Sequence, residues 1–280
     1  MSKLSLLVTV FIAAAVLSGC AVMQPPNANG PVGNRPVYPI LMIEDSERQE
    51  ATAVALMRLA SGNASVSSAR LQPVTGTVLS LPAKPSTPLY LTKLGADAVM
   101  TEEETRESLR RFITQWQELI GSDPAKLSLV SRIDQPDGVK LAIYEQRPFR
   151  YPIRGGYGKL QISFGADRRI IDVMSSCIPD ADEIQSALTG LTLKLKAEDA
   201  VALVRDAKGF KYFDATGNNQ NVTLLGSSDV VARGLTTYVI PARARVDTLE
   251  FHLAWELEIT NATVKFVYVD AVTGDIVAAQ

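Results

Sequence analysis

Residues 127–144 read LSLVSRIDQPDGVKLAIY, and this stretch decides the fold of the central part of the chain. Its two halves are rich in β-branched and apolar residues, which is typical of strands, and they flank a turn at 135–138. Gly138 stands where such a turn tolerates positive φ. Further strands are predicted at 159–164 and 170–174. The sequence therefore predicts a four-stranded antiparallel meander.

A helix is predicted immediately before this meander. Thr101 and Glu104 fit a capping box, in which each side chain binds the other residue's backbone N–H, and Gly121 supplies the stop signal. Between them, one continuous apolar stripe recurs at helical spacing: Leu109, Phe112, Ile113, Trp116, Leu119 and Ile120. We expect the helix to cover one face of the sheet, forming a module over residues 97–182.

The same order of elements recurs in residues 183–280. An acidic joint at 180–183 leads to a predicted helix at 195–208. Strands are then predicted at 236–240, 249–259, 264–269 and 275–279. The predicted fold class is α+β, with two consecutive modules, each a helix packed on an antiparallel β-sheet.

The segment ahead of both modules, residues 46–96, is less regular. Ser46 and Gln49 fit a capping box for a helix that runs to about residue 60, and a strand is predicted at 74–81. Two assignments stay open, because residues 40–96 could form a third small domain or extend the first module.

The chain opens with a short apolar run that ends in Leu17-Ser18-Gly19-Cys20. This run follows Lys3 and is too short to span roughly 30 Å of hydrocarbon, so residues 1–19 have the form of a removable signal. The tetrapeptide resembles the lipobox of bacterial lipoproteins. That resemblance implies cleavage between Gly19 and Cys20 and acylation of Cys20, the alternative being an ordinary secretory signal with an incidental cysteine. Two or more acyl chains, at ~0.8 kcal/mol per buried methylene, give stable attachment.

Residues 20–45, which carry five prolines among Asn and Gly, are predicted to be a flexible tether after the lipidated cysteine. The lipobox resemblance places the protein in the cell envelope, partnered with a membrane through its lipid anchor. Ala21, rather than an aspartate, follows the cysteine. By the same resemblance, this favours the outer membrane if the host has two.

Charge and cysteine content restrict the partners and the covalent structure. Loss of residues 1–19 removes Lys3 and leaves 261 residues with 27 basic and 30 acidic side chains, a net charge of −3. This balance argues against nucleic acid as a partner. With Cys20 lipidated, Cys177 is the remaining thiol, so no intramolecular disulfide can form. Cys177 is predicted to be a small buried residue at a strand end, with a reactive thiol as the alternative.

The C-terminal residues 267–277, VYVDAVTGDIV, resemble the closing hairpin of PepSY domains, whose signature is V-D-A-x-T-G-x-I. The preceding FHLAWELEI, residues 251–259, is similar to the strand that pairs with this hairpin in that family. Asp270 and Thr273 are predicted to accept hydrogen bonds from turn amides, and Gly274 to adopt the left-handed conformation. The resemblance covers roughly residues 190–280.

Residues 144–156, YEQRPFRYPIRGG, resemble the central hairpin of the fungalysin/thermolysin propeptide (FTP) module, Y-x-Q-x-Y-x-G-I-P-V-x-G-G. Pro148 stands where an aromatic residue is usual, and Arg150 replaces the turn glycine. The FTP module precedes PepSY in the propeptides of thermolysin-like metalloproteases, as it does here. The order of the two modules makes the joint resemblance more specific than either motif alone.

No catalytic constellation is recognisable in the sequence. A thermolysin-type zinc site needs the two histidines of H-E-x-x-H, and this chain has only His252, which is interpreted as a structural residue. A G-x-S-x-G elbow and a phosphate-binding loop are also missing. We therefore expect neither metal nor cofactor and no enzymatic activity, in a chain that ends where the propeptide would end. The cluster Asp180, Asp182 and Glu183 is interpreted as a solvated joint, with contact to a cation as the alternative.

The family's FTP–PepSY pair holds its protease inactive and helps it fold. By resemblance, this chain is predicted to be a membrane-anchored, non-catalytic binding protein that inhibits or assists the folding of an exported protein such as a peptidase. The alternative is a structural or adaptor lipoprotein that binds another envelope component. The predicted contact residues mix arginines with aromatics, which are enriched at interfaces: Arg147, Phe149, Arg150, Tyr151 and Arg154. A solvated loop whose aromatics pack on the sheet is the other interpretation of this stretch.

Overall fold

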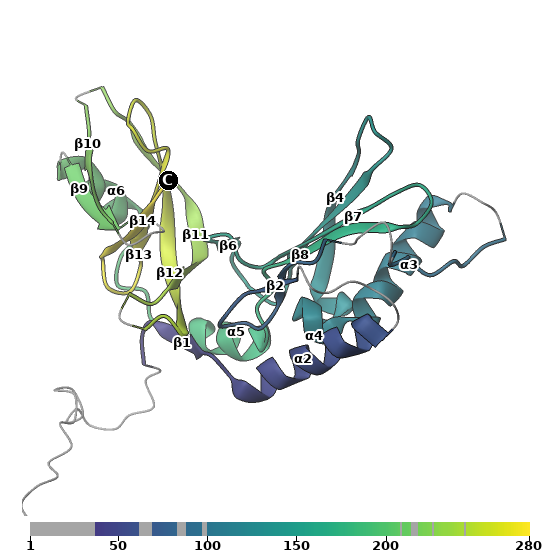
Figure 1. The fold of residues 1–280 in the computed structure, drawn as a ribbon. Helices are drawn as coiled ribbons and strands as arrows, with labels where there is room; N and C mark the ends of the chain where they lie inside the picture. The colour runs from purple at the N-terminus through teal and green to yellow at the C-terminus, as the bar shows by residue number, and fades with distance from the viewer. Residues whose placement is uncertain are drawn as a thin grey trace, which may run out of the picture. The chain divides into compact units, whose positions relative to one another are not determined.

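Figure 1 shows the fold in a computed structural model. The structure describes residues 37–61, 69–82, 88–96, 100–207, 209–213, 218–225, 227–243 and 245–280. These residues contain five α-helices and several sheets that are almost entirely antiparallel, so the predicted α+β class is confirmed. The predicted signal with Gly19, the lipidation site Cys20 and the tether up to residue 36 lie outside the described residues.

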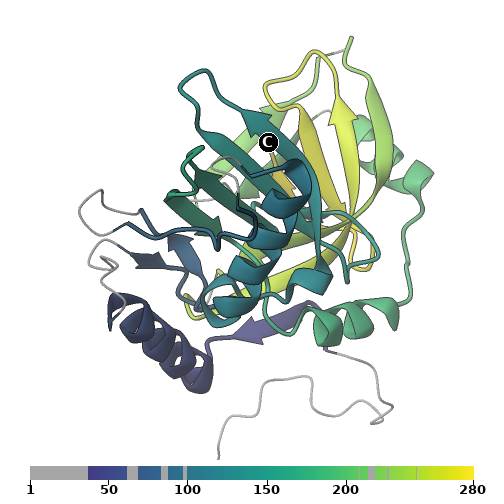
Figure 2. The same ribbon diagram turned by 90° about the vertical axis from the view of Figure 1, so that its right-hand side faces the viewer.

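The first sheet is an antiparallel meander, as predicted. Its strands, in spatial order, are β4 (Leu127–Asp134), β5 (Lys140–Gln146), β7 (Lys159–Phe164) and β8 (Ile170–Ser175). Helix α3 (Glu102–Gln115) lies across the strands (Figure 2) and begins with the capping box of Thr101 and Glu104. Leu109 and Phe112 of this helix share a buried cluster with Leu160 and Ile162 of the sheet, so burial of the apolar stripe holds the two layers together.

The predicted continuous helix to Ile120 is interrupted at Trp116, which departs from helical geometry with φ −118° and ψ 31°. A separate turn, α4 (Gln117–Ile120), follows and ends at Gly121, whose φ is +78°. The buried Trp116 ring lies under the guanidinium of Arg58, 5.3 Å from its centroid. The break therefore coincides with the packing of a second helix against this end of α3 and α4.

That second helix is α2 (Ser46–Ser61), and it extends the first module. Its cap is Asp45, whose Oδ1 accepts the Glu47 N–H at 3.0 Å, so the predicted Ser46–Gln49 capping box is wrong. The Gln49 side chain instead donates to the Pro73 carbonyl. Two short strands follow, β2 (Arg70–Leu71) and β3 (Val78–Ser80). Buried residues of this segment join the core under α3: Ala55, Leu59, Val78, Leu81 and Leu91.

The second sheet gathers strands from both ends of the chain. In spatial order they are β14 (Ile276–Ala279), β13 (Phe266–Asp270), β12 (Thr248–Ile259), β11 (Val230–Pro241) and β6 (Ile153–Arg154). In addition, β1 (Ile40–Ile43) pairs with β12. The predicted tether over 20–45 therefore runs too far, because Ile40 and Met42 are buried against this sheet.

Helix α6 (Ala197–Asp206) buries Ala200 and Val204 on one face of the second sheet. Beside them packs a hairpin that the sequence pattern does not predict, β9 (Gly209–Phe213) and β10 (Asn219–Thr223).

A further helix, α5 (Ala181–Thr189), occupies the predicted boundary between the modules. The acidic joint predicted at 180–183 is therefore wrong, because Asp182 and Glu183 form the first turn of this helix. Ile184 and Leu188 are buried with residues of β1, β11 and β12. A boundary at 182/183 thus cuts through an element whose apolar face helps to form a core of its own, which leaves the modules without a linker at this point.

Candidate functional site

The site predicted from the sequence lies on residues 147–158, here called the bridging loop. It leaves the first sheet at the end of β5 and returns to it in β7, and between these strands it contributes β6 to the second sheet (Figure 1). The Thr237 N–H donates to the Pro152 carbonyl at 2.9 Å. Ile153 and Arg154 then run parallel to Thr237 and Tyr238. One connection of the meander is thus an edge strand of the other sheet.

Glycines allow the bridging loop to approach β11 so closely. Gly155 has φ +87°, and a Cβ there would lie 2.0 Å from the Val239 carbonyl oxygen. Gly158 has φ +73°, and a Cβ there would lie 2.3 Å from the Ile153 side chain. A side chain at position 155 would therefore force the loop away from β11, whereas one at position 158 would displace the Ile153 side chain within the loop.

A buried glutamine fixes the start of the loop. Gln146 Nε2 donates to the Ile178 carbonyl at 2.9 Å, and Gln146 Oε1 accepts the Ile178 N–H at 2.8 Å. The amide therefore satisfies both backbone groups of one residue, as a neighbouring strand would. The loop starts from a rigid, fully hydrogen-bonded position.

Two of the five predicted contact residues prove to be internal anchors. Phe149 is buried in the cluster with Ile184, Val239 and Phe251, so its ring stabilises the loop and cannot reach a partner. Arg154 donates from Nε to Glu256 Oε2 at 2.5 Å and from Nη2 to Glu256 Oε1 at 3.3 Å. That bond to Glu256 raises the pKa of the Arg154 guanidinium. The assignment of Phe149 to a partner surface is wrong, because its ring is buried within the protein. Burial of such a ring stabilises the fold by about 1.5–3 kcal/mol.

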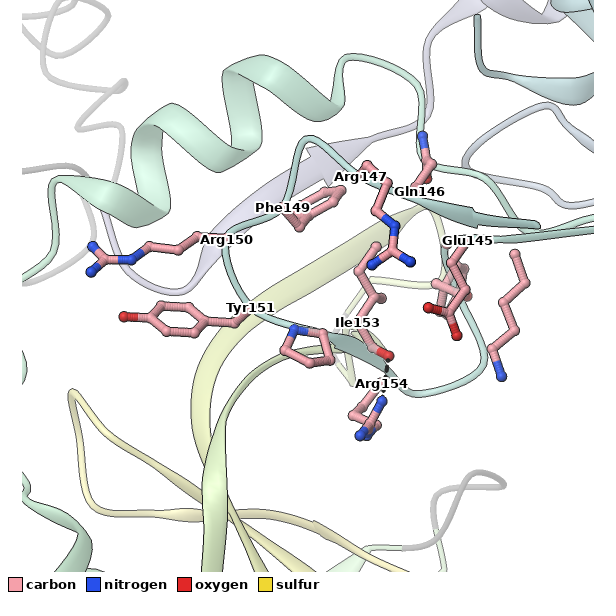
Figure 3. Close-up of a pocket in the computed structure, with 12 residues that line it drawn as sticks. Glu145, Gln146, Arg147, Phe149, Arg150, Tyr151, Ile153 and Arg154 are labelled. Atoms are coloured by element: carbon pink, nitrogen blue, oxygen red, sulfur yellow. Dashed lines mark hydrogen bonds between the residues drawn. The ribbon is translucent and has the colours of Figure 1, made fainter. Parts of the chain in front are cut away.

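The other three predicted contact residues are accessible. The Arg150 guanidinium lies 5.3 Å from the centroid of the Tyr151 ring, and the Arg150 N–H donates to Gln185 Oε1 of α5 at 2.6 Å. Figure 3 shows these two side chains pointing away from the loop, whereas Arg147 lies on its inner side, above Ile153 and Arg154. The loop therefore presents one stacked cation–aromatic pair outward and one arginine inward.

The inner side of the bridging loop encloses a pocket of about 170 Å³ (Figure 3). Its charged lining residues are Glu145, Arg147, Arg150, Arg154 and Lys159. Only Arg154 among them takes part in an ion pair with a described residue. The Arg150 side chain is directed outward, so the inner charges are those of Arg147 and Lys159, which outnumber the single unpaired carboxylate, that of Glu145, and the pocket favours an anion.

Away from the loop, Asp270, Thr273 and Gly274 form the last turn. Asp270 Oδ1 accepts the N–H groups of Val272 and Thr273 at 2.7 and 2.9 Å, and Gly274 has φ +87°. Asp270 Oδ2 accepts a hydrogen bond from the Tyr38 hydroxyl at 2.5 Å and lies 2.8 Å from His252 Nδ1. Neither contact is predicted from the sequence. Burial opposes ionisation of Asp270, but these hydrogen bonds outweigh it and lower the pKa of the carboxyl.

The remaining candidates are occupied structurally. The Cys177 thiol is buried, which raises its pKa to about 12 and leaves it unreactive at neutral pH. Asp180 pairs with Arg48 at 2.7 Å, and Asp182 pairs with Lys126. Across the described ranges, no group of three or more His, Cys, Asp or Glu residues is arranged to hold a metal ion. None of the described helices is both long and apolar enough to cross a membrane.

No family model matches this chain, and no curated protein matches its sequence. Among solved structures, it matches an uncharacterized protein from Eubacterium rectale with a TM-score of 0.30 and 11% sequence identity. That match covers 86% of this chain and 84% of the other.

Proposed function

We propose that this chain is a non-catalytic binding protein that resembles the propeptide of thermolysin-like metalloproteases and engages an exported partner, in the first instance a peptidase, as an inhibitor or folding aid. Cys20 would tether it to a membrane. The order of FTP-like and PepSY-like segments supports the choice of partner. The observation that carries a binding role is the stacked Arg150–Tyr151 pair on a loop fixed at both ends.

The loop's rigidity matters because binding has to offset the entropy of ordering the contact residues. Here Phe149, Gly155 and the Arg154–Glu256 pair hold the backbone in place before any partner arrives. Arginine and tyrosine are also the residue types that most often dominate interface energies. Arg150 and Tyr151 are therefore the residues whose truncation should cost the most affinity.

The test is capture of partners from host envelope by the full-length chain in detergent, with mass spectrometry of what is retained. Each captured peptidase is then assayed with increasing amounts of the chain. The variant Arg150→Ala/Tyr151→Ala should lose at least tenfold in apparent affinity, as expected when two hot-spot residues are removed. Lys265→Ala is the matched control, because Lys265 also lies over an aromatic ring, 5.2 Å from Phe266, on the distant strand β13.

Capture of a peptidase together with dose-dependent loss of its activity, or with improved refolding, would support the proposal. A peptidase that is bound but fully active and unassisted would contradict it. Capture of a different envelope protein alone would leave the adaptor role. If the loop variant and the Lys265 variant behaved alike, the bridging loop would not be the contact surface.

A further inference from the structure

The inner side of the bridging loop carries positive charge that the fold does not use. The guanidinium of Arg147 forms no hydrogen bond or ion pair with any described residue, although its backbone N–H is held by the Lys126 carbonyl at 2.9 Å. Lys159 stands opposite Glu145 in the β5–β7 register but forms no ion pair with it in the described chain. By contrast, the arginines of α3 are paired: Arg106, Arg110 and Arg111 bind Glu102 and Glu107.

The same pocket is bordered by an open strand edge. In a parallel ladder, the residues that bond to the neighbour alternate with residues whose backbone groups face the other way. Pro152 accepts from Thr237, so the N–H and C=O of Ile153 face away from β11. No described strand lies on that side, since β6 ends the sheet. The Ile153 carbonyl is covered by Arg154 Nη1 at 3.3 Å, which leaves its N–H as an available donor.

A pocket of about 170 Å³ is smaller than the several hundred Å³ typical of sites for drug-sized ligands. It suits the side chain of one residue in an extended segment. Because more cationic side chains than unpaired carboxylates line the pocket, the residue that it binds should be acidic.

We propose that the partner binds through an extended acidic segment that lies along β6, with a carboxylate side chain held by Arg147 and Lys159 and a backbone carbonyl bonded to the Ile153 N–H. This inference rests on the proposed binding function and specifies the partner's chemistry. Arg150, on the outer side of the loop, would meet a second acidic residue of the same segment.

The test uses fluorescein-labelled peptides of alternating Val and Glu, acetylated and amidated so that no terminal carboxylate is present. Binding to the full-length chain in detergent is followed by fluorescence anisotropy. We expect the Glu peptide to bind at least tenfold more tightly than its Gln counterpart, with the difference decreasing as salt rises. Arg147→Gln/Lys159→Gln should abolish the preference for Glu. Arg106→Gln/Arg110→Gln, on paired arginines of α3, should leave it unchanged.

Strand addition is tested on the peptide, so that the protein's fold is untouched. Two isomeric Glu peptides are N-methylated on alternate residues. In one, the methyl groups lie on one edge of the extended peptide, and in the other they lie on the opposite edge. Strand addition predicts that at least one isomer binds with tenfold or more lower affinity than the unmodified peptide. The methyl groups replace backbone N–H donors and sterically block one edge of the peptide. Undiminished binding of both isomers would overturn strand addition, and equal binding of Glu and Gln peptides would overturn the acidic site. If a Gln peptide with a free C-terminus matched the Glu peptide, the site would be one for a chain-terminal carboxylate instead.

These outcomes separate the inference from the proposed function. A partner that needs Arg150 and Tyr151 but is not displaced by the Glu peptide would leave the proposed function standing and refute the acidic segment. Binding of the Glu peptide with no peptidase captured would refute the proposed partner and leave the acidic site.

Discussion

Two polar anchors hold distant segments to the second sheet, and they differ in their access to water. At one edge, the pair Arg154–Glu256 fixes β6, and the arginine side chain is 39% exposed while that of the glutamate is 11% exposed. At the end of β13, Asp270 binds Tyr38, just ahead of β1, and His252 of β12, and the Asp270 side chain is 1% exposed. Removal of the Asp270 carboxylate would leave several donors without their acceptor, whereas removal of the part-exposed Arg154 guanidinium leaves Glu256 with the Tyr268 hydroxyl as a donor at 3.1 Å. The comparison therefore assigns stability to the Asp270 anchor and loop positioning to the Arg154 anchor.

The largest effect should come from Asp270→Ala. This change leaves the Tyr38 hydroxyl, His252 and two turn amides without their acceptor, so we expect unfolding free energy to fall by about 4 kcal/mol. Urea denaturation measures it. Asp275→Ala, in the same turn but exposed, is the control and should change stability by about 0.5 kcal/mol or less. A loss near that of the control would show that the buried anchor does not carry the stability assigned to it.

Within the bridging loop, two aromatic residues should behave in opposite ways. Phe149→Ala removes a buried ring and should lower unfolding free energy by about 3 kcal/mol. Tyr151→Ala removes a partly exposed ring and should cost about 0.5 kcal/mol or less, while weakening capture of the partner. Thermal and urea unfolding of the two variants, side by side, test this. Equal destabilisation would mean that Tyr151 is also a structural residue.

The first sheet could be predicted because its pattern is local. Alternating apolar residues, the 135–138 turn and the Thr101–Glu104 box are each readable within a few residues, and each matches the structure. The helix α5 is not predicted, although Ala181, Ile184 and Leu188 follow helical spacing, because the acidic residues 182 and 183 in its first turn resemble a linker. Its burial depends on β1 and β12, which are remote in sequence.

The site was predicted only in part, for the same reason. The Gly-Gly pair and the arginines of the loop are visible in the sequence, but β6 pairs with β11 about eighty residues later. No local signal distinguishes Phe149, which turns into the core, from Tyr151, which faces outward. Likewise, the hydrogen bond from Tyr38 to Asp270 depends on the pairing of β1 with β12, which no local pattern predicts.

A smaller effect is expected from Arg154→Gln, because the arginine is the part-exposed member of the pair and the buried Glu256 carboxylate keeps the Tyr268 hydroxyl as a donor at 3.1 Å. We expect a loss of about 1 kcal/mol in unfolding free energy, decreasing further at high salt. Hydrogen exchange is the sharper measurement: the Thr237 N–H, which donates to Pro152, should exchange faster as β6 loosens. Arg233→Gln breaks a similar pair with Glu258 inside β11 and β12, and should leave that amide unchanged. If the Thr237 N–H exchanged equally fast in both variants, Arg154 would not be a positioning residue for β6.

The smallest and most specific effect is the pH dependence of the Asp270 anchor. Its carboxyl has a folded-state pKa below the usual value, because hydrogen bonds from His252, Tyr38 and two turn amides overcome the opposing effect of burial. The stability that it contributes is therefore complete above the unfolded pKa of about 3.9 and is lost as pH falls through the folded pKa. Asp270→Asn cannot ionise, so the gap in unfolding free energy between wild type and this variant should narrow from pH 5 to pH 3. Asp275→Asn should show no comparable narrowing, and parallel curves for Asp270→Asn and wild type would mean that the ionised carboxylate is not what holds Tyr38 in place.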